Sequence, residues 1–300
     1  MALNSYINFS KSKNQRPRAI LLLIITAILW SLGGMLIKSV NIHPLAIAGV
    51  RSIIASGVFL VLLGKPKING STAQIGAAIS YAGTVILFVL ATKATTAANA
   101  IFLQYTAPIY VALLSSWLLK EKIRVLDWVT VFLVFGGMAL FFLDNLSPTG
   151  ILGNIFGLAS GICFAFEAIF LRMQKDGSPW ESVFLGNLLT AVIGLPFLTQ
   201  AWPNTFDWVE LLILGVVQLG ISYVLYSIAI KHTTAIEAIL IPVIEPILNP
   251  VWVLLFVGEK PGFWAIVGGI TVLAAITIRG VLVEMPISSR KKIISQNEKC

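Results

Sequence analysis

One carboxylate, Glu245, interrupts the apolar stretch IEPILNPVWVLLFV, residues 244–257. Pro246 and Pro250 lack an amide N–H, so the carbonyl group four residues before each proline has no helical donor. Loose carbonyl groups beside a carboxylate attract an ammonium group or a proton. The alternative is that a protonated Glu245 and Asn249 only satisfy these carbonyl groups in a kinked structural helix.

The depth of this carboxylate follows from helix geometry. If a helix begins near Ala235, Glu245 lies about 15 Å along its axis, at about 1.5 Å per residue. That is close to the centre of a bilayer core about 30 Å thick. A charge there costs about 3 kcal/mol on insertion scales and should face protein or water. Glu237, Glu245 and Asn249 share one helical face, which we expect to look into the bundle.

The whole chain has the composition of a membrane protein. Its 300 residues are 57% hydrophobic and 11% charged, with a mean hydropathy of +0.91, which is too apolar for soluble cores. Stretches of about 20 apolar residues are long enough to cross a bilayer as helices. The fold class predicted is therefore all-α integral membrane. The sequence predicts ten transmembrane helices, at residues 19–38, 45–64, 73–92, 96–119, 125–143, 150–172, 179–199, 208–230, 235–257 and 262–283.

The formal charge of +8 reflects how the 21 Lys and Arg residues are distributed among the loops. With ten spans, most of them fall on the side of the amino terminus. Cytoplasmic loops carry such an excess, so we expect a multi-pass protein of the cytoplasmic membrane with both termini in the cytoplasm. The excess of basic residues then reflects the orientation in which the chain inserts into the membrane, and no nucleic-acid partner is expected.

The chain also contains an internal repeat. The pattern AxKxTTAxxAI occurs from Ala91 and again from Ala229, and in the same register Pro108 aligns with Pro246. This repeat predicts a five-helix unit used twice. Because five is odd, the second unit enters the membrane from the opposite side, which gives two inverted five-helix repeats. Inverted repeats are typical of alternating-access carriers with a substrate site near the midplane; alternatively, duplication supplies only a stable bundle.

The predicted organisation has four parts. They are a cytoplasmic tail at 1–18, a first five-helix repeat at 19–143, a second five-helix repeat at 150–283 and a cytoplasmic tail at 284–300.

The fourth predicted helix is the repeat partner of the helix that carries Glu245. It keeps Pro108 but has Ala107 in place of the carboxylate, and it offers Gln104 and Tyr105 near the same depth. A shared site would therefore be asymmetric. An amide and a phenol at that depth suit an organic solute, although both are equally ordinary as packing residues.

Other candidates lie near the predicted midplane. Trp30 and Phe164 are repeat counterparts, and a buried indole N–H needs a partner that a cavity would supply. Glu167 continues a stripe of small residues on the sixth helix, where it either lines the cavity or extends to the membrane surface. Tyr81 and Gln218 are weaker candidates, along with Tyr223 and Tyr226. The predicted substrate-binding residues are Trp30, Tyr81, Gln104, Tyr105, Pro108, Phe164, Glu167, Gln218, Glu245 and Asn249.

Arg51 lies within the second predicted span. Three roles are open for its side chain. It could pair with a carboxylate of the protein, bind a carboxylate of the substrate, or extend to the outer headgroups, and we favour the last two equally.

Three segments resemble the drug/metabolite transporter superfamily, specifically its ten-helix EamA-type members. They are AILWSLGGMLIKSV at 27–40, TAPIYVALLSSWLLKEK at 106–122 and IEPILNPVWVLLFVGEKPGFWAIVGGITVLAA at 244–275. The resemblance implies four-helix groups that rock about a central cavity, with the fifth and tenth helices peripheral. It also implies structural roles for Glu121 and Glu259. Members move amino acids, other small metabolites, drugs or phosphorylated sugars, so the family does not specify the substrate.

These observations predict a secondary transporter that exports small organic metabolites, amino acids or related compounds, by alternating access. The alternatives are a proton-coupled antiporter for cationic drugs and, from another class, an intramembrane enzyme. The chain contains no GxSxG, HExxH or Walker A sequence, so we expect neither enzymatic activity nor a cofactor. The expected partners are a small-molecule substrate, membrane lipid and the proton as candidate coupling ion, with the protein a monomer or homodimer.

Overall fold

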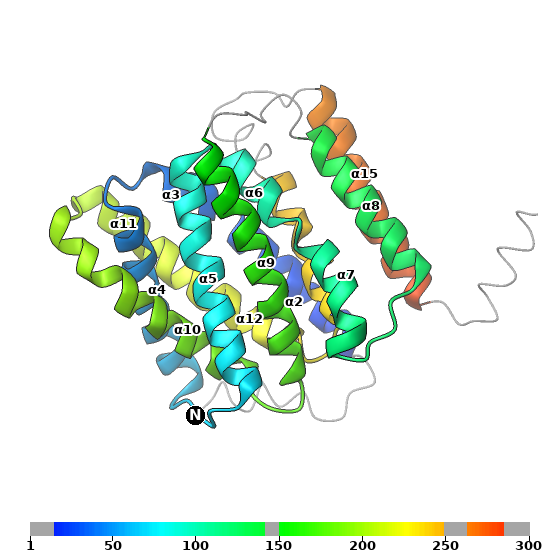
Figure 1. Cartoon of the computed structure of the whole chain (residues 1–300), viewed down its shortest axis with the longest axis horizontal. Helices are drawn as coiled ribbons and strands as arrows, with labels where there is room; N and C mark the ends of the chain where they lie inside the picture. The colour runs from blue at the N-terminus through cyan, green and yellow to red at the C-terminus, as the bar shows by residue number, and fades with distance from the viewer. Residues whose placement is uncertain (1–14, 142–149, 249–262, 285–300) are drawn as a thin grey trace, which may run out of the picture.

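The computed structural model describes residues 15–141, 150–248 and 263–284. Every regular element in those ranges is a helix (Figure 1). The α-helices are α2 (Gln15–Trp30), α3 (Gly33–Ser39), α4 (Pro44–Leu63), α5 (Thr72–Ala94), α6 (Ala97–Gln104), α7 (Ala107–Leu118), α8 (Val125–Phe141), α9 (Ile151–Met173), α10 (Pro179–Gly194), α11 (Thr205–Ile213), α12 (Ser222–Ala229), α13 (Ala235–Leu240) and α15 (Phe263–Glu284). Leu195–Gln200 and Ile241–Val243 are 3₁₀-helical, and Leu214–Ile221 is π-helical.

Eight helical segments in the described part of the chain are long and apolar enough to cross a membrane. They cover residues 15–39, 44–63, 72–94, 99–118, 151–173, 179–200, 205–229 and 266–283. The fifth predicted span appears as α8, whose apolar segment Val125–Leu140 is shorter. The ninth predicted span, 235–257, continues into residues outside the described ranges. The all-helical membrane architecture is thus confirmed, whereas the count of ten remains a prediction.

The repeated sequence pattern produces the same local structure in both halves. Thr96 is the N-cap of α6, where its hydroxyl accepts a hydrogen bond from the backbone N–H of Asn99 at 3.1 Å. Thr234, its repeat counterpart, is the N-cap of α13 and accepts from the N–H of Glu237 at 3.3 Å. Such caps satisfy amide groups that have no helical partner at the start of a helix. The threonines of the repeat therefore begin equivalent helices.

Ion pairs hold together the end of the bundle at which α2 begins, which we call the amino-terminal end. Arg16 of α2 lies 2.6 Å from the carboxylate of Glu237 in α13. Arg279 of α15 contacts both Glu237 and Asp127, which is in the first turn of α8. These contacts join four helices, and they place Arg16 and Arg279 at this end.

Lysine contacts mark the opposite end of the bundle. Lys38, in the last turn of α3, donates to the backbone oxygen of Thr95 at 2.8 Å. Helix α9 begins at the same end, because a Cβ atom at Gly153 would lie 2.7 Å from the Thr95 nitrogen. It ends near α13, where Arg172 donates to the backbone oxygen of Lys231. Helices α2 and α9 therefore run in opposite directions.

Small residues allow α9 to lie close to its neighbours in the centre of the bundle. A Cβ atom at Gly161 would come within 2.7 Å of the backbone oxygen of Gln104, so only glycine permits this approach to the end of α6. Gly153 and Gly157 of the same helix also lie close to the chain around Thr95 and Leu103. Helices α8 and α15 pack against each other at one edge of the bundle (Figure 1), away from the centre where α5, α6 and α9 meet.

Candidate functional site

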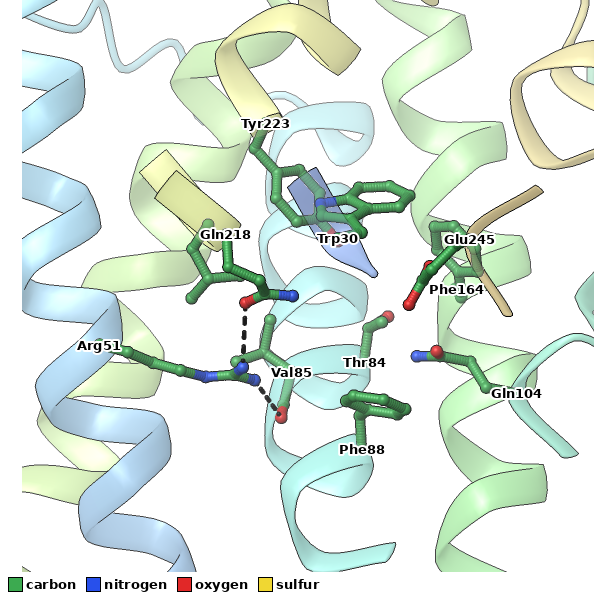
Figure 2. Close-up of a pocket in the computed structure, with 11 residues that line it drawn as sticks. Trp30, Arg51, Thr84, Val85, Phe88, Gln104, Phe164, Gln218, Tyr223 and Glu245 are labelled. Carbon is green, nitrogen blue, oxygen red and sulfur yellow. Dashed lines mark hydrogen bonds between the residues drawn. The ribbon is translucent and has the colours of Figure 1, made fainter. Parts of the chain in front are cut away.

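A cavity with an empty volume of about 390 Å³ lies where the central helices meet (Figure 2). Five of the predicted substrate-binding residues line it: Trp30, Gln104, Phe164, Gln218 and Glu245. The remaining lining residues are Arg51, Thr84, Val85, Phe88, Leu219 and Tyr223. Residues from both halves of the chain therefore build one site.

The first broken helix contributes an amide to this cavity. Helix α6 ends at Gln104 and α7 begins at Ala107, because Pro108 has no N–H for the Gln104 carbonyl. The side chain of Gln104 donates from Nε2 to Ser160 Oγ at 2.9 Å. Ser160 in turn donates to the backbone oxygen of Thr84 at 3.0 Å. This chain of bonds fixes the orientation of the Gln104 amide at the cavity wall.

The second broken helix contributes the carboxylate. Helix α13 ends at Leu240, a 3₁₀ turn covers Ile241–Val243, and residues 244–248 are helical again. Pro246 removes the helical donor of the Pro242 carbonyl, as the sequence predicted. Tyr105, from the break between α6 and α7, places its hydroxyl 2.8 Å from this carbonyl oxygen and 2.7 Å from Glu245 Oε2. One phenol thus joins the two helix breaks.

The two contacts of the Tyr105 hydroxyl require two protons. A phenol carries one proton and donates it to one acceptor at a time. Both contacts are hydrogen bonds together only when Tyr105 donates to Pro242 and a protonated Glu245 donates to the Tyr105 oxygen. When Glu245 loses its proton, the Tyr105 hydroxyl turns to the carboxylate and the Pro242 carbonyl is left without a donor. The protonation state of Glu245 therefore determines whether the Tyr105 hydroxyl donates a hydrogen bond to the Pro242 carbonyl.

We predict that Tyr105→Phe lowers the stability of the protein by about 1–3 kcal/mol, because it leaves the Pro242 carbonyl and Glu245 buried without this partner. The measurement is unfolding in detergent. The matched control is Tyr110→Phe, which changes a half-buried tyrosine of the neighbouring helix α7 and should shift stability by less than about 0.5 kcal/mol. Equal stabilities of the two variants would contradict the role assigned to the Tyr105 hydroxyl.

A buried guanidinium group lies across the cavity from this carboxylate. Arg51 of α4 is only 1% exposed. It donates to Gln218 Oε1 and to the backbone oxygen of Val85, each at 3.2 Å, and its Nε has no hydrogen-bond partner. In the part of the chain that the structure describes, Arg51 forms no ion pair. Figure 2 shows Arg51 and Glu245 approaching the cavity from opposite sides.

This placement decides between the interpretations of Arg51 that the sequence left open. The expectation that Arg51 reaches the outer headgroups is wrong, because its side chain is buried and lines the cavity. Packing against α10 and the π-helical stretch draws α4 into the interior. A guanidinium group without a protein carboxylate is available to an anionic ligand group.

Four aromatic residues, Trp30, Phe164, Tyr223 and Tyr226, form what we call the aromatic layer. The Trp30 ring lies 5.0 Å from that of Tyr223, 5.2 Å from Tyr226 and 5.8 Å from Phe164, between centroids. The Trp30 indole donates to Ser222 Oγ at 2.9 Å, which confirms the expected buried partner. Trp30, Phe164 and Tyr223 of this layer line the cavity and offer flat apolar faces to a ligand, whereas Tyr226 packs behind them.

Three other predicted residues are placed outside the cavity lining. Tyr81 is buried and donates to Asn187 Oδ1 at 3.0 Å, outside the cavity lining. Pro108 is buried at the helix break. Glu167 is 0% exposed, so the alternative in which it extends to the membrane surface is wrong. Asn249 lies outside the described residues.

The glutamates near the helix ends serve structure. Glu121 pairs with Arg172 at 2.9 Å and accepts a hydrogen bond from the backbone N–H of Ala235; Glu259 lies outside the described ranges. Glu237 belongs to the ion pairs of the amino-terminal end and does not line the cavity. At the same end, burial lowers the pKa of His232, and the charges of Lys231 and Arg172 lower it further.

Comparison with known proteins identifies the family. A model described as the EamA-like transporter family matches residues 17–143 and, a second time, residues 151–279. The chain belongs to this family. It is a multi-pass membrane protein of the transporter class, as the resemblance implied.

Individual relatives agree with this membership. The chain is 26% identical over 257 residues to an uncharacterized transporter of Archaeoglobus fulgidus, an alignment that covers 85% of this chain and 94% of the relative. It is 22% identical over 284 residues to the uncharacterized transporter YxxF of Bacillus subtilis, covering 90% and 91%. A protein of known crystal structure has a TM-score of 0.77 at 16% identity, covering 90% of this chain and 100% of that one. This last likeness concerns the fold alone.

Proposed function

We propose that this EamA-family protein is a secondary transporter that exports zwitterionic small metabolites, amino acids or related compounds, by alternating access. The observation that carries the proposal is the placement of two groups that can carry opposite charges, Arg51 and Glu245, on opposite sides of one buried cavity. Family membership supports transport, and this pair supports the class of substrate.

Each charged group of the site suits one group of an amino acid. The guanidinium of Arg51 has the fork geometry that binds a carboxylate, and Gln218 holds it in position through Oε1. Glu245, ionised, accepts hydrogen bonds from an ammonium group. The aromatic faces of Trp30 and Phe164 accommodate an apolar side chain between the two.

The same pair distinguishes a zwitterion from a cationic drug. A ligand with only a positive charge would enter a buried site that already contains the Arg51 guanidinium, and like charges at close range are unfavourable. A carboxylate on the ligand removes this repulsion.

Two further observations support the transport cycle. The family matches twice along the chain, and the first helices of the two matched regions, α2 and α9, run in opposite directions, as inverted repeats require. The hydrogen bonds of Tyr105 support the proton as the coupling ion. Both form only when Glu245 is protonated, and an ammonium group can bind the Glu245 carboxylate only after Glu245 has released that proton. The charge distribution supports a cytoplasmic amino-terminal end.

The test is counterflow in liposomes with the purified full-length protein. Each labelled amino acid is compared with the amine that lacks its carboxylate and with the acid that lacks its ammonium group, with and without a pH gradient. We expect counterflow of the zwitterion only, accelerated by a gradient that drives protons in the opposite direction. Transport of organic cations without transport of any zwitterion would overturn the proposal.

A further inference from the structure

Glu167 is a second buried carboxylate, and its environment differs from that of Glu245. It is 0% exposed, and neither of its oxygen atoms has a hydrogen-bond partner. No ion pair of the described residues includes it. Burying a carboxylate without hydrogen bonds or a counter-charge is expensive, so a protein that keeps one in its interior retains it for something other than packing.

Glu167 lies between the cavity and the amino-terminal end of the bundle. Phe164 lines the cavity, and Glu167 follows it by three residues on α9, about 4.5 Å further along the axis toward that end. Glu167 does not line the cavity itself. The aromatic layer, with ring centroids 5.0–6.5 Å apart, lies at this wall of the cavity. The carboxylate is therefore sealed behind the layer in this conformation.

The described groups around Glu167 are neutral hydroxyl, thiol and ring groups. The hydroxyl groups of Thr84 and Tyr223 approach its carboxylate without the geometry of a hydrogen bond. Its other titratable neighbours are Tyr81, Tyr226 and Cys163. The hydroxyl of Tyr226 is buried and has no hydrogen-bond partner either. Three unpartnered oxygen atoms, two from Glu167 and one from Tyr226, are thus gathered beside aromatic faces.

This set of groups matches a primary ammonium group. Such a group has three N–H donors and no acceptor, and the faces of tyrosine and tryptophan rings attract cations.

We propose that Glu167 and Tyr226 form a second binding site for the ammonium group of the substrate, closed in this conformation by the aromatic layer and opened when the cavity faces the amino-terminal end. The inference rests on the proposed function and adds a second ammonium-binding site along the transport path. The ammonium group passes from Glu245 to Glu167, or in reverse, when the rings of the layer separate. The open form of such a site is a minor conformation that ligand binding makes dominant.

The test compares substrate presented to the two faces of the membrane, with right-side-out and inside-out vesicles. Glu167→Gln should raise the half-saturating concentration about tenfold or more for substrate at the face of the amino-terminal end, because it loses a charge-assisted bond. At the other face the half-saturating concentration should change less than about twofold. The melting temperature should not fall, since in this conformation the Glu167 carboxyl group forms no hydrogen bond that the variant would remove.

The outcomes separate the inference from its alternatives. A structural carboxylate would give a lower melting temperature and equal loss at both faces, and this result overturns the inference, as does an unchanged half-saturating concentration at both faces. Tyr226→Phe should give a weaker effect with the same sidedness, and it replaces Glu167→Gln if that variant does not fold. Glu181→Gln is the matched control, because Glu181 is a buried carboxylate at the same end that already accepts a bond from Lys67. Folded wild-type protein that moves no zwitterion overturns the proposed function instead.

Discussion

Glu245→Gln should reduce counterflow of a zwitterionic substrate more than any other single change at the broken helices. The variant keeps the size and a hydrogen-bonding group at the cavity wall but loses the negative charge that binds an ammonium group. Hydrogen bonds to charged groups contribute about 1.5–3 kcal/mol, so the half-saturating concentration should rise about 10- to 150-fold. Acceleration by a pH gradient should disappear, because the side chain no longer exchanges a proton.

The control for this experiment is a carboxylate outside the cavity. Glu181→Gln changes a buried glutamate of α10 that contacts the backbone of Lys67, and counterflow should remain within about twofold of wild type. Full counterflow by Glu245→Gln would exclude a charged ammonium site at this position. A loss of transport that leaves the response to the pH gradient intact would place the coupling proton on another group.

The helix break at Pro246 is predicted from the sequence because it depends on local chemistry. A proline removes its own N–H wherever it occurs, so the loss of the donor to the Pro242 carbonyl follows from Pro246 alone. The threonine that precedes each repeated helix caps it in both halves for an equally local reason. Burial of Glu245 follows from the cost of a charge at the centre of a bilayer.

The partners of these groups depend on tertiary packing and are not predictable from spacing. Tyr105 and Pro242 are separated by 137 positions, and no pattern in the sequence links a phenol in one half with a carbonyl group in the other. The same holds for Trp30 and Ser222. Sequence reasoning indicated that such partners are required but did not identify them.

The lining of the cavity shows a second reason for incomplete prediction. Val85, Phe88 and Leu219 line it, yet apolar residues occur on every face of a membrane helix and carry no signal of a site. Arg51 did carry a signal, since a cation within a span is costly. The orientation of the Arg51 side chain could not be derived from the sequence, because an arginine at that depth is long enough to reach either the headgroups or the interior. Packing of α4 against the π-helical stretch resolves this choice.

Arg51→Met should change which ligands the protein accepts. Methionine keeps much of the apolar volume of the side chain but removes the only charge proposed to bind the substrate carboxylate. We expect counterflow of the zwitterion to fall at least about tenfold, since truncating one partner of a buried charge pair costs about 2–5 kcal/mol. Competition by the amine that lacks the carboxylate should strengthen, because its ammonium group no longer meets a buried cation. The control is Gln218→Glu, which pairs with Arg51 internally and should also block the zwitterion while keeping the guanidinium. If Arg51→Met transports the zwitterion as wild type does, the carboxylate of the substrate is bound elsewhere, and the assignment of the two charges to the two ends of an amino acid fails.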